Sequence, residues 1–361
     1  MKTELLDYEL PDSAIARFPA EARDGARLLV LHDGERLEDA RIVDWPELVP
    51  EGALVVLNAT RVRRARVFGA RRPGGGRVEF LFIEQVERFE GAGRERWRVL
   101  GRANKPLSAG TVIDADGGMR VEVLSPLSQV ERVEPGVLEV AVSVESNESV
   151  EVVLERSGHV PIPPYLDRGD VPEDATRYQT VYAERISSVA APTAGLHLTE
   201  ALLARLEARG VRTARLELSV GLGTFRPVIV DDLDQHTMHV ERYVVPRAVA
   251  DGVADARRRG AAVVAVGTTV VRALESAADE SRPGEVRVRD SETRLLIQPG
   301  YRFRVVDALL TNFHQPRSTL LALVSAFAGY ERTFAAYRHA LSSGYRFLSY
   351  GDALWIPRRV D

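Results

Sequence analysis

Residues 188–199 read SVAAPTAGLHLT, and the chain is organised around this uncharged stretch, which contains Gly195 and ends in His197 and Thr199. The helical run EALLARLEARG follows at once, so Thr199 is expected to be the N-cap and Gly210 the C′ residue of a helix. A loop that leads into a helix start brings polar groups to unpaired backbone N–H groups, where the helix dipole favours negative charge. A buried, hydrogen-bonded histidine in a tight connection explains the same residues equally well, and both interpretations stay open at this point.

The composition predicts a folded protein with a sizeable core. The chain has 361 residues, which favours two domains, and 45% of them are hydrophobic, which argues against disorder. The absence of cysteine excludes disulfides, cysteine-ligated zinc and thiol catalysis. We expect no signal peptide and no membrane span, because the N-terminal stretch MKTELLDYELPDS lacks an apolar region and the longest apolar runs are short. A cytoplasmic location is therefore expected.

The net charge of −4 is unlike that of a protein that coats nucleic acid, so any contact with RNA must come from a local basic patch. The stretch NATRVRRARVFGARR, residues 58–72, offers such a patch with Arg61, Arg63, Arg64 and Arg66. These arginines either line a solvated strand face or bind phosphates as bidentate ligands. The sequence leaves both interpretations open.

The middle of the chain predicts an antiparallel β-barrel. The short strand-like runs RVEFLFI, RWRVLG, GTVIDA, MRVEVL and GVLEVAV are separated by breaks rich in glycine and proline, and no helical period appears. Buried strands are expected before this region at 28–31 and 53–57, and helices and strands alternate in the last third. The sequence therefore predicts an α/β domain formed by residues 1–61 and 150–361, with an inserted β-barrel domain formed by residues 62–149.

Polar residues gather where predicted strands end, which in an open α/β sheet is the edge that binds ligands. They are Thr193, His197, Thr224, Thr268, Arg272, Asn312, His314 and Asp352. We expect Thr268 or Thr269 to be the N-cap of a helix over 268–278, and Ser318 to cap the helix that follows. A final strand over 345–356 is expected to include Tyr350 and Asp352.

Two weaker motifs lie in between. In GLGTFRPV, Gly221 and Gly223 would let the backbone approach a ligand closely. HTMHVER contains His236, His239 and Glu241, but it lacks an HExxH pattern and follows an acidic loop, so no metal site is expected. The chain also lacks a nucleophile elbow, a P-loop and a dinucleotide-binding fingerprint. These patterns predict a small-molecule site without naming a reaction.

Long motifs that follow one another in order over almost the whole chain resemble one family, the S-adenosylmethionine:tRNA ribosyltransferase-isomerases of queuosine biosynthesis. The matching stretches are YELPDSAIARFP, LNATRVRRARVFG, GGGRVEFLF, GHVPIPPYLDR, YQTVYAE, SVAAPTAGLHLT, VGLGTFRPV, HTMHVERYVV, AVGTTVVRALE, PGYRFRVVDALLTNFHQPRSTLLALVSAFAGY and YRFLSYGDALWIP.

The resemblance implies a transfer and isomerisation of the ribosyl moiety of S-adenosylmethionine. The acceptor is the aminomethyl group of 7-aminomethyl-7-deazaguanine at the tRNA wobble position, and the products are epoxyqueuosine, adenine and methionine. S-adenosylmethionine is then a substrate, no separate cofactor or metal is needed, and the macromolecular partner is the tRNA anticodon loop. The family's expected form is a cytoplasmic monomer with no membrane association. The implied fold, an α/β domain with an inserted barrel, agrees with the strand pattern.

Motif position and residue type then suggest site residues. His197, His314 and Asp352 are the expected catalytic residues, with the two histidines transferring protons and Asp352 binding or orienting. Substrate binding is expected from Thr193, Gly195, Gly223, Thr224, Thr268, Arg272 and Asn312. Contacts with tRNA are expected from Arg61, Arg63, Arg64 and Arg66. The sequence does not assign the residue that removes the C5′ proton.

Four departures from the pattern of the resembled family involve five residues. Ser219 stands where a histidine is usual, Ala59 and Val270 replace polar residues, and the pair Arg63-Arg64 replaces Ile-Pro. Three hypotheses follow: an ordinary member of the family, a paralogue that uses the same ribosyl chemistry on a small-molecule acceptor, and a non-catalytic protein that binds RNA or nucleosides.

Overall fold

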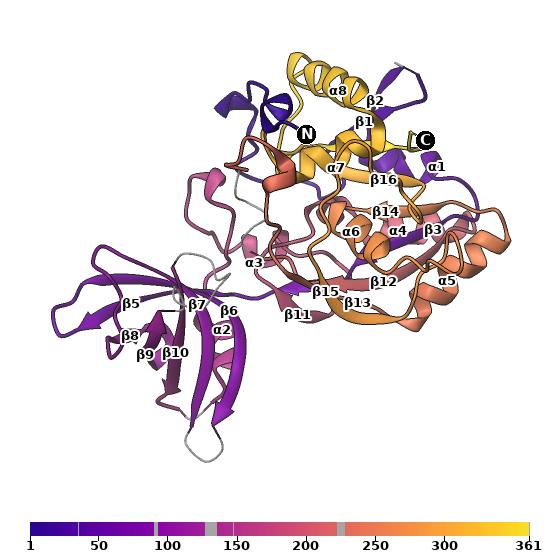
Figure 1. Ribbon diagram of the computed structural model, residues 1–361. Coiled ribbons are helices and arrows are strands. Elements are labelled where there is room, and N and C mark those ends of the chain that lie inside the picture. Colours follow the sequence, from indigo (N-terminus) through magenta and orange to yellow (C-terminus); the bar gives the residue numbers. More distant parts are fainter. Residues whose placement is uncertain (35, 90–92, 127–135, 147, 222–227, 361) are drawn as a thin grey trace.

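The structure, a computed structural model, describes residues 1–34, 36–89, 93–126, 136–146, 148–221 and 228–360. A larger α/β part contains both ends of the chain, and a smaller all-β part extends from it to one side (Figure 1). The predicted fold class, an α/β domain with an inserted antiparallel barrel, is confirmed.

A nine-stranded mixed sheet forms the centre of the larger part, in the order β15-β13-β12-β3-β14-β16-β17-β1-β2. Its strands are β1 (Arg27–Leu31), β2 (Leu37–Arg41), β3 (Leu54–Asn58), β12 (Arg212–Leu218), β13 (Glu241–Val245), β14 (Val263–Val266), β15 (Arg289–Thr293), β16 (Ala308–Asn312) and β17 (Ala353–Ile356). Strands β12, β3, β14 and β16 are parallel, whereas β17 runs antiparallel to β16. The carboxyl ends of the four parallel strands and the beginning of β17 therefore share one edge.

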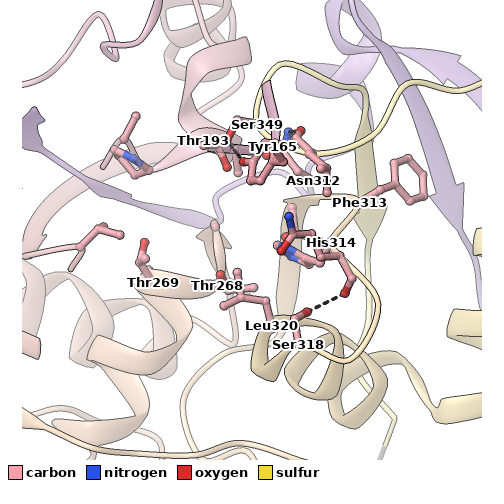
Figure 2. Close-up of a pocket in the computed structure, with 18 residues that line it drawn as sticks. Tyr165, Thr193, Thr268, Thr269, Asn312, Phe313, His314, Ser318, Leu320 and Ser349 are labelled. Carbon is pink, nitrogen blue, oxygen red and sulfur yellow. Dashed lines mark hydrogen bonds between the residues drawn. The ribbon is translucent and has the colours of Figure 1, made fainter. Parts of the chain in front are cut away.

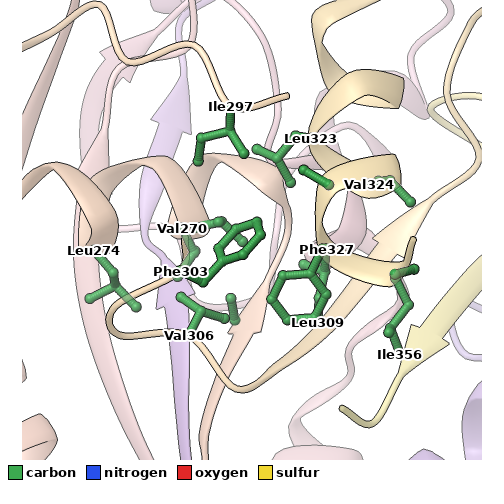
Figure 3. Close-up of a cluster of buried hydrophobic side chains, with 14 of the residues drawn as sticks. Val270, Leu274, Ile297, Phe303, Val306, Leu309, Leu323, Val324, Phe327 and Ile356 are labelled. Atoms are coloured by element: carbon green, nitrogen blue, oxygen red, sulfur yellow. The ribbon is translucent and has the colours of Figure 1, made fainter. Parts of the chain in front are cut away.

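Helices cover both faces of the sheet because its central strands are apolar on both sides. Along β3, Val55 and Leu57 belong to the core under helices α1 (Trp45–Leu48) and α4 (Glu200–Ala208). Leu54 and Val56 belong to the opposite core, which is covered by α5 (Arg247–Arg258), α6 (Thr268–Ser276), α7 (Thr319–Ala328) and α8 (Tyr330–Ser342). Figure 3 shows Val270, Phe303, Leu309 and Phe327 packed within this second core.

The smaller part is a closed antiparallel barrel, in the order β10-β7-β6-β5-β8-β9. Its strands are β5 (Arg66–Arg72), β6 (Arg77–Phe89), β7 (Arg94–Ala103), β8 (Val112–Ala115), β9 (Met119–Pro126) and β10 (Val137–Val144). Alternating side chains such as Phe80, Phe82 and Trp97 fill its interior without solvent exposure. Helix α2 (Val150–Ser157) packs on the barrel through Val153 and Leu154.

Short elements connect the two parts and shape the edge of the sheet. Strand β4 (Thr60–Val62) pairs in parallel with β11 (Arg185–Ser188). Single turns follow at η6 (Pro164–Leu166), α3 (Asp174–Arg177) and η7 (Thr193–His197). The stretch 188–199 thus includes the last residue of β11, a loop, and η7 before α4 begins.

The predicted helix caps are partly confirmed. Thr199 accepts a hydrogen bond from the backbone N–H of Leu202 at 3.2 Å, and Ser318 accepts one from Leu321 at 3.1 Å. Gly210 follows the C-cap of α4 with a φ of 73°, as expected for a C′ glycine.

The expected cap of α6 was wrong, because the helix begins at Thr268 and Gly267 is its N-cap. Strand β14 ends only one residue earlier, and the chain turns directly into the helix at a φ of 94° and a ψ of 151°, a conformation open essentially to glycine alone. The expected final strand was too long: β17 begins at Ala353, and Asp352 lies in the turn before it. Leu348 starts that turn with a φ of 71°.

Candidate active site

A cavity opens where the parallel strands end, and Figure 2 shows the residues around it. It encloses about 650 Å³, counting its opening to solvent. The lining includes Tyr165, Pro192, Thr193, Ala194, Gly267, Thr268, Thr269, Thr311, Asn312, Phe313, His314, Gln315, Ser318, Leu348 and Ser349. Within the described part of the chain, the side chains that line this cavity are apolar or neutral, and none has a formal charge at neutral pH unless His314 is protonated.

A buried asparagine ties together the strand ends on one side of the cavity. The Asn58 side chain at the end of β3 donates to the carbonyl of Leu218 at 3.0 Å and to Thr269 Oγ1 at 3.3 Å. Its Oδ1 accepts from the N–H of Leu218 at 3.1 Å. These bonds join β3, β12 and the first turn of α6, so the position of Thr269 at the cavity is fixed by the sheet.

Asn312, at the end of β16, links the cavity to His197. Its Nδ2 donates to the carbonyl of Leu348 at 3.1 Å and lies 3.3 Å from Nε2 of His197. Its Oδ1 is buried and has no hydrogen-bond partner in the described part of the chain. His197 is 4% exposed, and burial lowers its pKa to about 4. His197 is therefore a neutral residue behind the cavity wall, in contact with a residue that lines the cavity.

His314 lines the cavity itself. Its Nε2 lies 2.9 Å from Thr311 Oγ1, and its backbone N–H donates to the Tyr337 hydroxyl at 2.9 Å. Its carbonyl accepts from the Tyr8 hydroxyl at 2.5 Å. Burial lowers the pKa of His314 to about 3, so the ring is neutral at physiological pH.

A second polar pair at the cavity, Tyr165 and Ser349, was not predicted from the sequence; their hydroxyls lie 2.5 Å apart. The prolines before Tyr165 force an extended course over residues 161–163, and the turn η6 that follows brings the tyrosine to the edge of the sheet. Ser349 follows Leu348, whose left-handed backbone turns the chain back toward β17. Both residues stand in motifs that supported the family resemblance, but no spacing rule pointed to them.

Several expected site residues are used elsewhere. Gly195 packs under Tyr182, and a Cβ at this position would collide with the tyrosine hydroxyl. Arg272 forms a buried ion pair with Glu241 and donates to the carbonyl of Leu295 at 3.0 Å, and burial lowers its pKa to about 10. It does not appear among the described residues of the cavity lining.

Asp352 holds the turn before β17, where it accepts from the backbone N–H groups of Arg27 at 2.9 Å and Arg346 at 2.7 Å. Gly223 and Thr224 lie outside the described residues. Thr193, Thr268, Asn312 and His314 are therefore the expected site residues that the structure brings together at the cavity.

The arginines near the barrel largely bind to the protein itself. Arg63 Nε lies 3.0 Å from the Glu151 carboxylate, and its guanidinium stands over the ring of Trp97. Arg66 pairs with Glu79 at 2.7 Å, and Arg64 donates to the carbonyl of Glu155 at 3.1 Å. Arg61 is the most solvent-exposed of those in ion pairs here, with a side chain 46% exposed and 3.7 Å from Glu155.

The described residues contain no group of three or more His, Cys, Asp or Glu side chains arranged to hold a metal ion. Glu241, which the sequence places near His236 and His239, is paired with Arg272. In the same part of the chain, no helix has the length and hydrophobicity needed to cross a membrane.

None of the four departures is among the cavity-lining residues that the structure describes, but Val270 adjoins the lining residue Thr269 and Ser219 adjoins Val220. Val270 and Ala59 are buried in the two hydrophobic cores of the sheet. The backbone N–H of Ser219 donates to the carbonyl of Arg242 at 2.9 Å, and its side chain is half-buried. Arg63 packs at the barrel. The changes at Ala59 and Val270 therefore lie in hydrophobic packing environments.

Comparison with known proteins gives a consistent result over the full length. A family model described as "Queuosine biosynthesis protein" matches residues 3–356. A protein of Sorangium cellulosum (strain So ce56), named S-adenosylmethionine:tRNA ribosyltransferase-isomerase, is 55% identical over 379 residues, with 100% of both chains covered. The protein of the same name from Anaeromyxobacter dehalogenans (strain 2CP-C) is 49% identical, covering 99% of this chain and 100% of its own. The crystal structure of an S-adenosylmethionine tRNA ribosyltransferase from Thermotoga maritima is similar with a TM-score of 0.53 at 33% identity, covering 98% of this chain and 99% of that one.

Proposed function

This chain belongs to the queuosine biosynthesis protein family, and we propose that it is an S-adenosylmethionine:tRNA ribosyltransferase-isomerase. It transfers and isomerises the ribosyl moiety of S-adenosylmethionine onto the aminomethyl group of 7-aminomethyl-7-deazaguanine at the tRNA wobble position. The observation that supports this most is the 55% identity to a protein of that name over the whole of both chains. The location of Ala59 and Val270 in the hydrophobic cores of the sheet favours the ordinary member over a paralogue with another acceptor.

The cavity at the sheet edge is proposed to hold the nucleoside part of S-adenosylmethionine. Its neutral lining, with Thr193, Thr268 and Asn312 among apolar side chains, suits an uncharged adenosyl group. The N-termini of α6 and α7 both reach this cavity, because Thr268 begins the first helix and Ser318 caps the second. Unpaired N–H groups at such ends stabilise negative charge, which develops on adenine as it leaves.

His314 is the proposed proton acceptor for the C5′ carbon, whose acidity is raised by the adjacent sulfonium. A base must be unprotonated to act, as His314 is in the cavity, but burial also weakens its basicity, so this role requires its pKa to rise when the substrate is bound. Its contact with Thr311 Oγ1 holds the ring in place. Asp352 is proposed to orient the turn before β17. The substrate-binding region is proposed to include Gly195, Gly223, Thr224 and Arg272.

The proposed function also implies an acceptor, a location and a domain organisation. The acceptor is the tRNA anticodon loop, which Arg61, Arg63, Arg64 and Arg66 are candidates to approach. S-adenosylmethionine is a substrate, with no further cofactor or metal. The enzyme works as a monomer in the cytoplasm, with an α/β domain of residues 1–61 and 150–361 and a barrel domain of residues 62–149.

The test is a mass-spectrometric assay of adenine and methionine release from S-adenosylmethionine. It compares tRNA that contains 7-aminomethyl-7-deazaguanine, the free deazapurine base and no acceptor. We expect release only with the modified tRNA, together with epoxyqueuosine in that tRNA. Product on the free base would favour the paralogue, and binding of S-adenosylmethionine without turnover on any acceptor would favour a non-catalytic protein.

A further inference from the structure

The side chain of Asn312 can take only one orientation. The carbonyl oxygen of Leu348 can only accept hydrogen bonds, so the Asn312 atom that lies 3.1 Å from it must be the amide nitrogen. The same carbonyl accepts from the N–H of Gly351 at 3.0 Å, within the turn that begins at the left-handed Leu348. A flipped amide would place two oxygens against each other, and the turn fixes the carbonyl that prevents this.

His197 accepts a hydrogen bond from the second N–H of the same amide group. Its Nε2 lies 3.3 Å from Asn312 Nδ2, so Nε2 must be unprotonated and the ring neutral. The histidine is 4% exposed, and burial lowers its pKa to about 4, which is consistent with this state. An Nε2 that accepts from Asn312 is not free to take a proton from a substrate.

This arrangement leaves the amide oxygen of Asn312 without a partner among the residues that the structure describes. The oxygen is buried, although Asn312 lines the cavity, and the residue is 2% exposed. A buried carbonyl that lacks a donor is costly, and a ligand that supplies one gains affinity. The described lining has no carboxylate to pair with the ammonium group of methionine, so the donor belongs to the neutral part of the ligand.

We propose that Asn312 Oδ1 accepts a hydrogen bond from an N–H or O–H group of the nucleoside part of S-adenosylmethionine, and that His197 is a positioning residue that locks this amide. The inference rests on the proposed function, since it takes S-adenosylmethionine as the ligand. It assigns His197 a role different from the proton transfer expected from the sequence. His197 affects the ligand only by orienting Asn312, and this requires a hydrogen-bond acceptor at the position of Nε2.

The experiment measures the dissociation constant of S-adenosylmethionine by calorimetry, without tRNA, for the unsubstituted protein and for substituted variants. Asn312→Ala is expected to weaken binding about 10- to 100-fold, because the ligand donor loses its acceptor. His197→Leu is expected to weaken it about 5- to 20-fold, because the amide is then held by the Leu348 carbonyl alone and loses one of the two contacts that position it. His197→Gln places a carbonyl oxygen near the position of Nε2 and is expected to restore binding to within about 3-fold.

A double variant tests whether the two residues act as one unit. Asn312→Ala combined with His197→Leu is expected to bind within about 2-fold of Asn312→Ala alone, because no amide remains to be positioned. The matched control is Ser325→Ala in α7, which removes another buried polar group that has no partner among the described residues and lies outside the described cavity lining. It is expected to leave the dissociation constant unchanged, and thermal unfolding checks that each variant is folded.

Four results would overturn the inference in whole or in part. If folded Asn312→Ala binds S-adenosylmethionine as tightly as the unsubstituted protein, Asn312 is not the acceptor. If the losses of binding free energy add in the double variant, or if His197→Gln binds as weakly as His197→Leu, His197 does not position the amide. A His197→Gln variant that binds normally but loses kcat by more than 100-fold assigns His197 to proton transfer instead. If the unsubstituted protein binds no S-adenosylmethionine at all, the proposed function fails, and this inference fails with it.

Discussion

Two neutral histidines lie at and behind the cavity, and their burial has a consequence for stability. Both pKa values fall from 6.5 in an exposed histidine to about 4 for His197 and about 3 for His314. As pH falls below 6.5, the unfolded chain therefore binds protons that the folded chain does not, and the free energy of unfolding decreases. Each histidine contributes about 2 kcal/mol of this loss between pH 7.5 and pH 5.

The first prediction is that His314→Gln has a weaker pH dependence of stability than the unsubstituted protein. The decrease in the free energy of unfolding from pH 7.5 to pH 5 should be smaller by about 2 kcal/mol. Urea unfolding followed by the fluorescence of Trp45 and Trp355 measures it, since these two rings pack together in the core of the α/β part. A Trp97→Phe background removes the signal of the barrel. Equal pH dependence in the two proteins would mean that His314 already titrates normally in the folded state.

The second prediction concerns Val270, which stands where the resembled family has serine. Its side chain is fully buried in the core between the sheet and its helices. Val270→Ser should therefore lower the free energy of unfolding by about 2 kcal/mol, because it removes apolar packing and buries a hydroxyl. The KM for S-adenosylmethionine should change less than about 2-fold, since the residue does not line the described cavity. A clear gain in turnover from this change would show that the position acts on the site after all.

At the scale of single elements, the junction of β14 and α6 is the most constrained part of the site. Gly267 leaves the strand at a φ of 94° and a ψ of 151° and starts the helix whose first residues line the cavity. A Cβ added there would lie 3.6 Å from the Cβ of Ala194, an ordinary contact. The difficulty of a side chain at Gly267 is therefore one of backbone conformation rather than space.

The third prediction follows from this junction. Gly267→Ala should lower the free energy of unfolding by about 1–3 kcal/mol and weaken S-adenosylmethionine binding at least about 10-fold, as Thr268 and Thr269 shift. Gly260→Ala is the matched control, because Gly260 also has a positive φ of 63° but has no atom within 4 Å of an added Cβ. It should cost about 1 kcal/mol without changing binding. Thermal unfolding and calorimetry measure the two effects, and equal binding by both variants would contradict the role of the junction.

The elements themselves could largely be predicted from local patterns, whereas the site could be predicted only in part. Thr199 and Ser318 cap helices as their sequence context indicated. The roles of Gly267 and Leu348 depend on backbone angles that tertiary structure imposes, and a pattern of residue types does not encode them. Arg272 was expected at the cavity because it follows a strand end, but it lies one helical turn further on, where Glu241 pairs with it. Neighbours across the sheet decide such cases, and their contacts are not visible in one sequence.

At the scale of the whole molecule, the charge distribution predicts that S-adenosylmethionine and tRNA bind by different kinds of interaction. The cavity lining described here is neutral, whereas tRNA is a polyanion and the protein has a net charge of −4. Binding of tRNA must therefore depend on local arginines that are not already neutralised. Arg63 is held by Glu151 with a side chain 10% exposed, but Arg61 is 46% exposed and only loosely paired with Glu155.

The fourth prediction is that ionic strength affects the two substrates differently. Between 50 and 300 mM salt, the dissociation constant of S-adenosylmethionine should change less than about 3-fold, because screening acts weakly on a neutral site. The KM for tRNA should rise steeply, with a logarithmic slope set by the number of phosphates contacted. Arg61→Ala should reduce that slope by about 0.7, the value for one phosphate contact on a single strand.

Arg63→Ala is the comparison variant. It should leave the slope unchanged but lower the free energy of unfolding by about 1–3 kcal/mol, because Glu151 loses its partner. Steady-state kinetics at several salt concentrations measure both slopes. If Arg63→Ala reduced the slope and Arg61→Ala did not, the ion pair with Glu151 would have to open when tRNA binds, and the barrel side of the molecule would be the surface that the tRNA contacts.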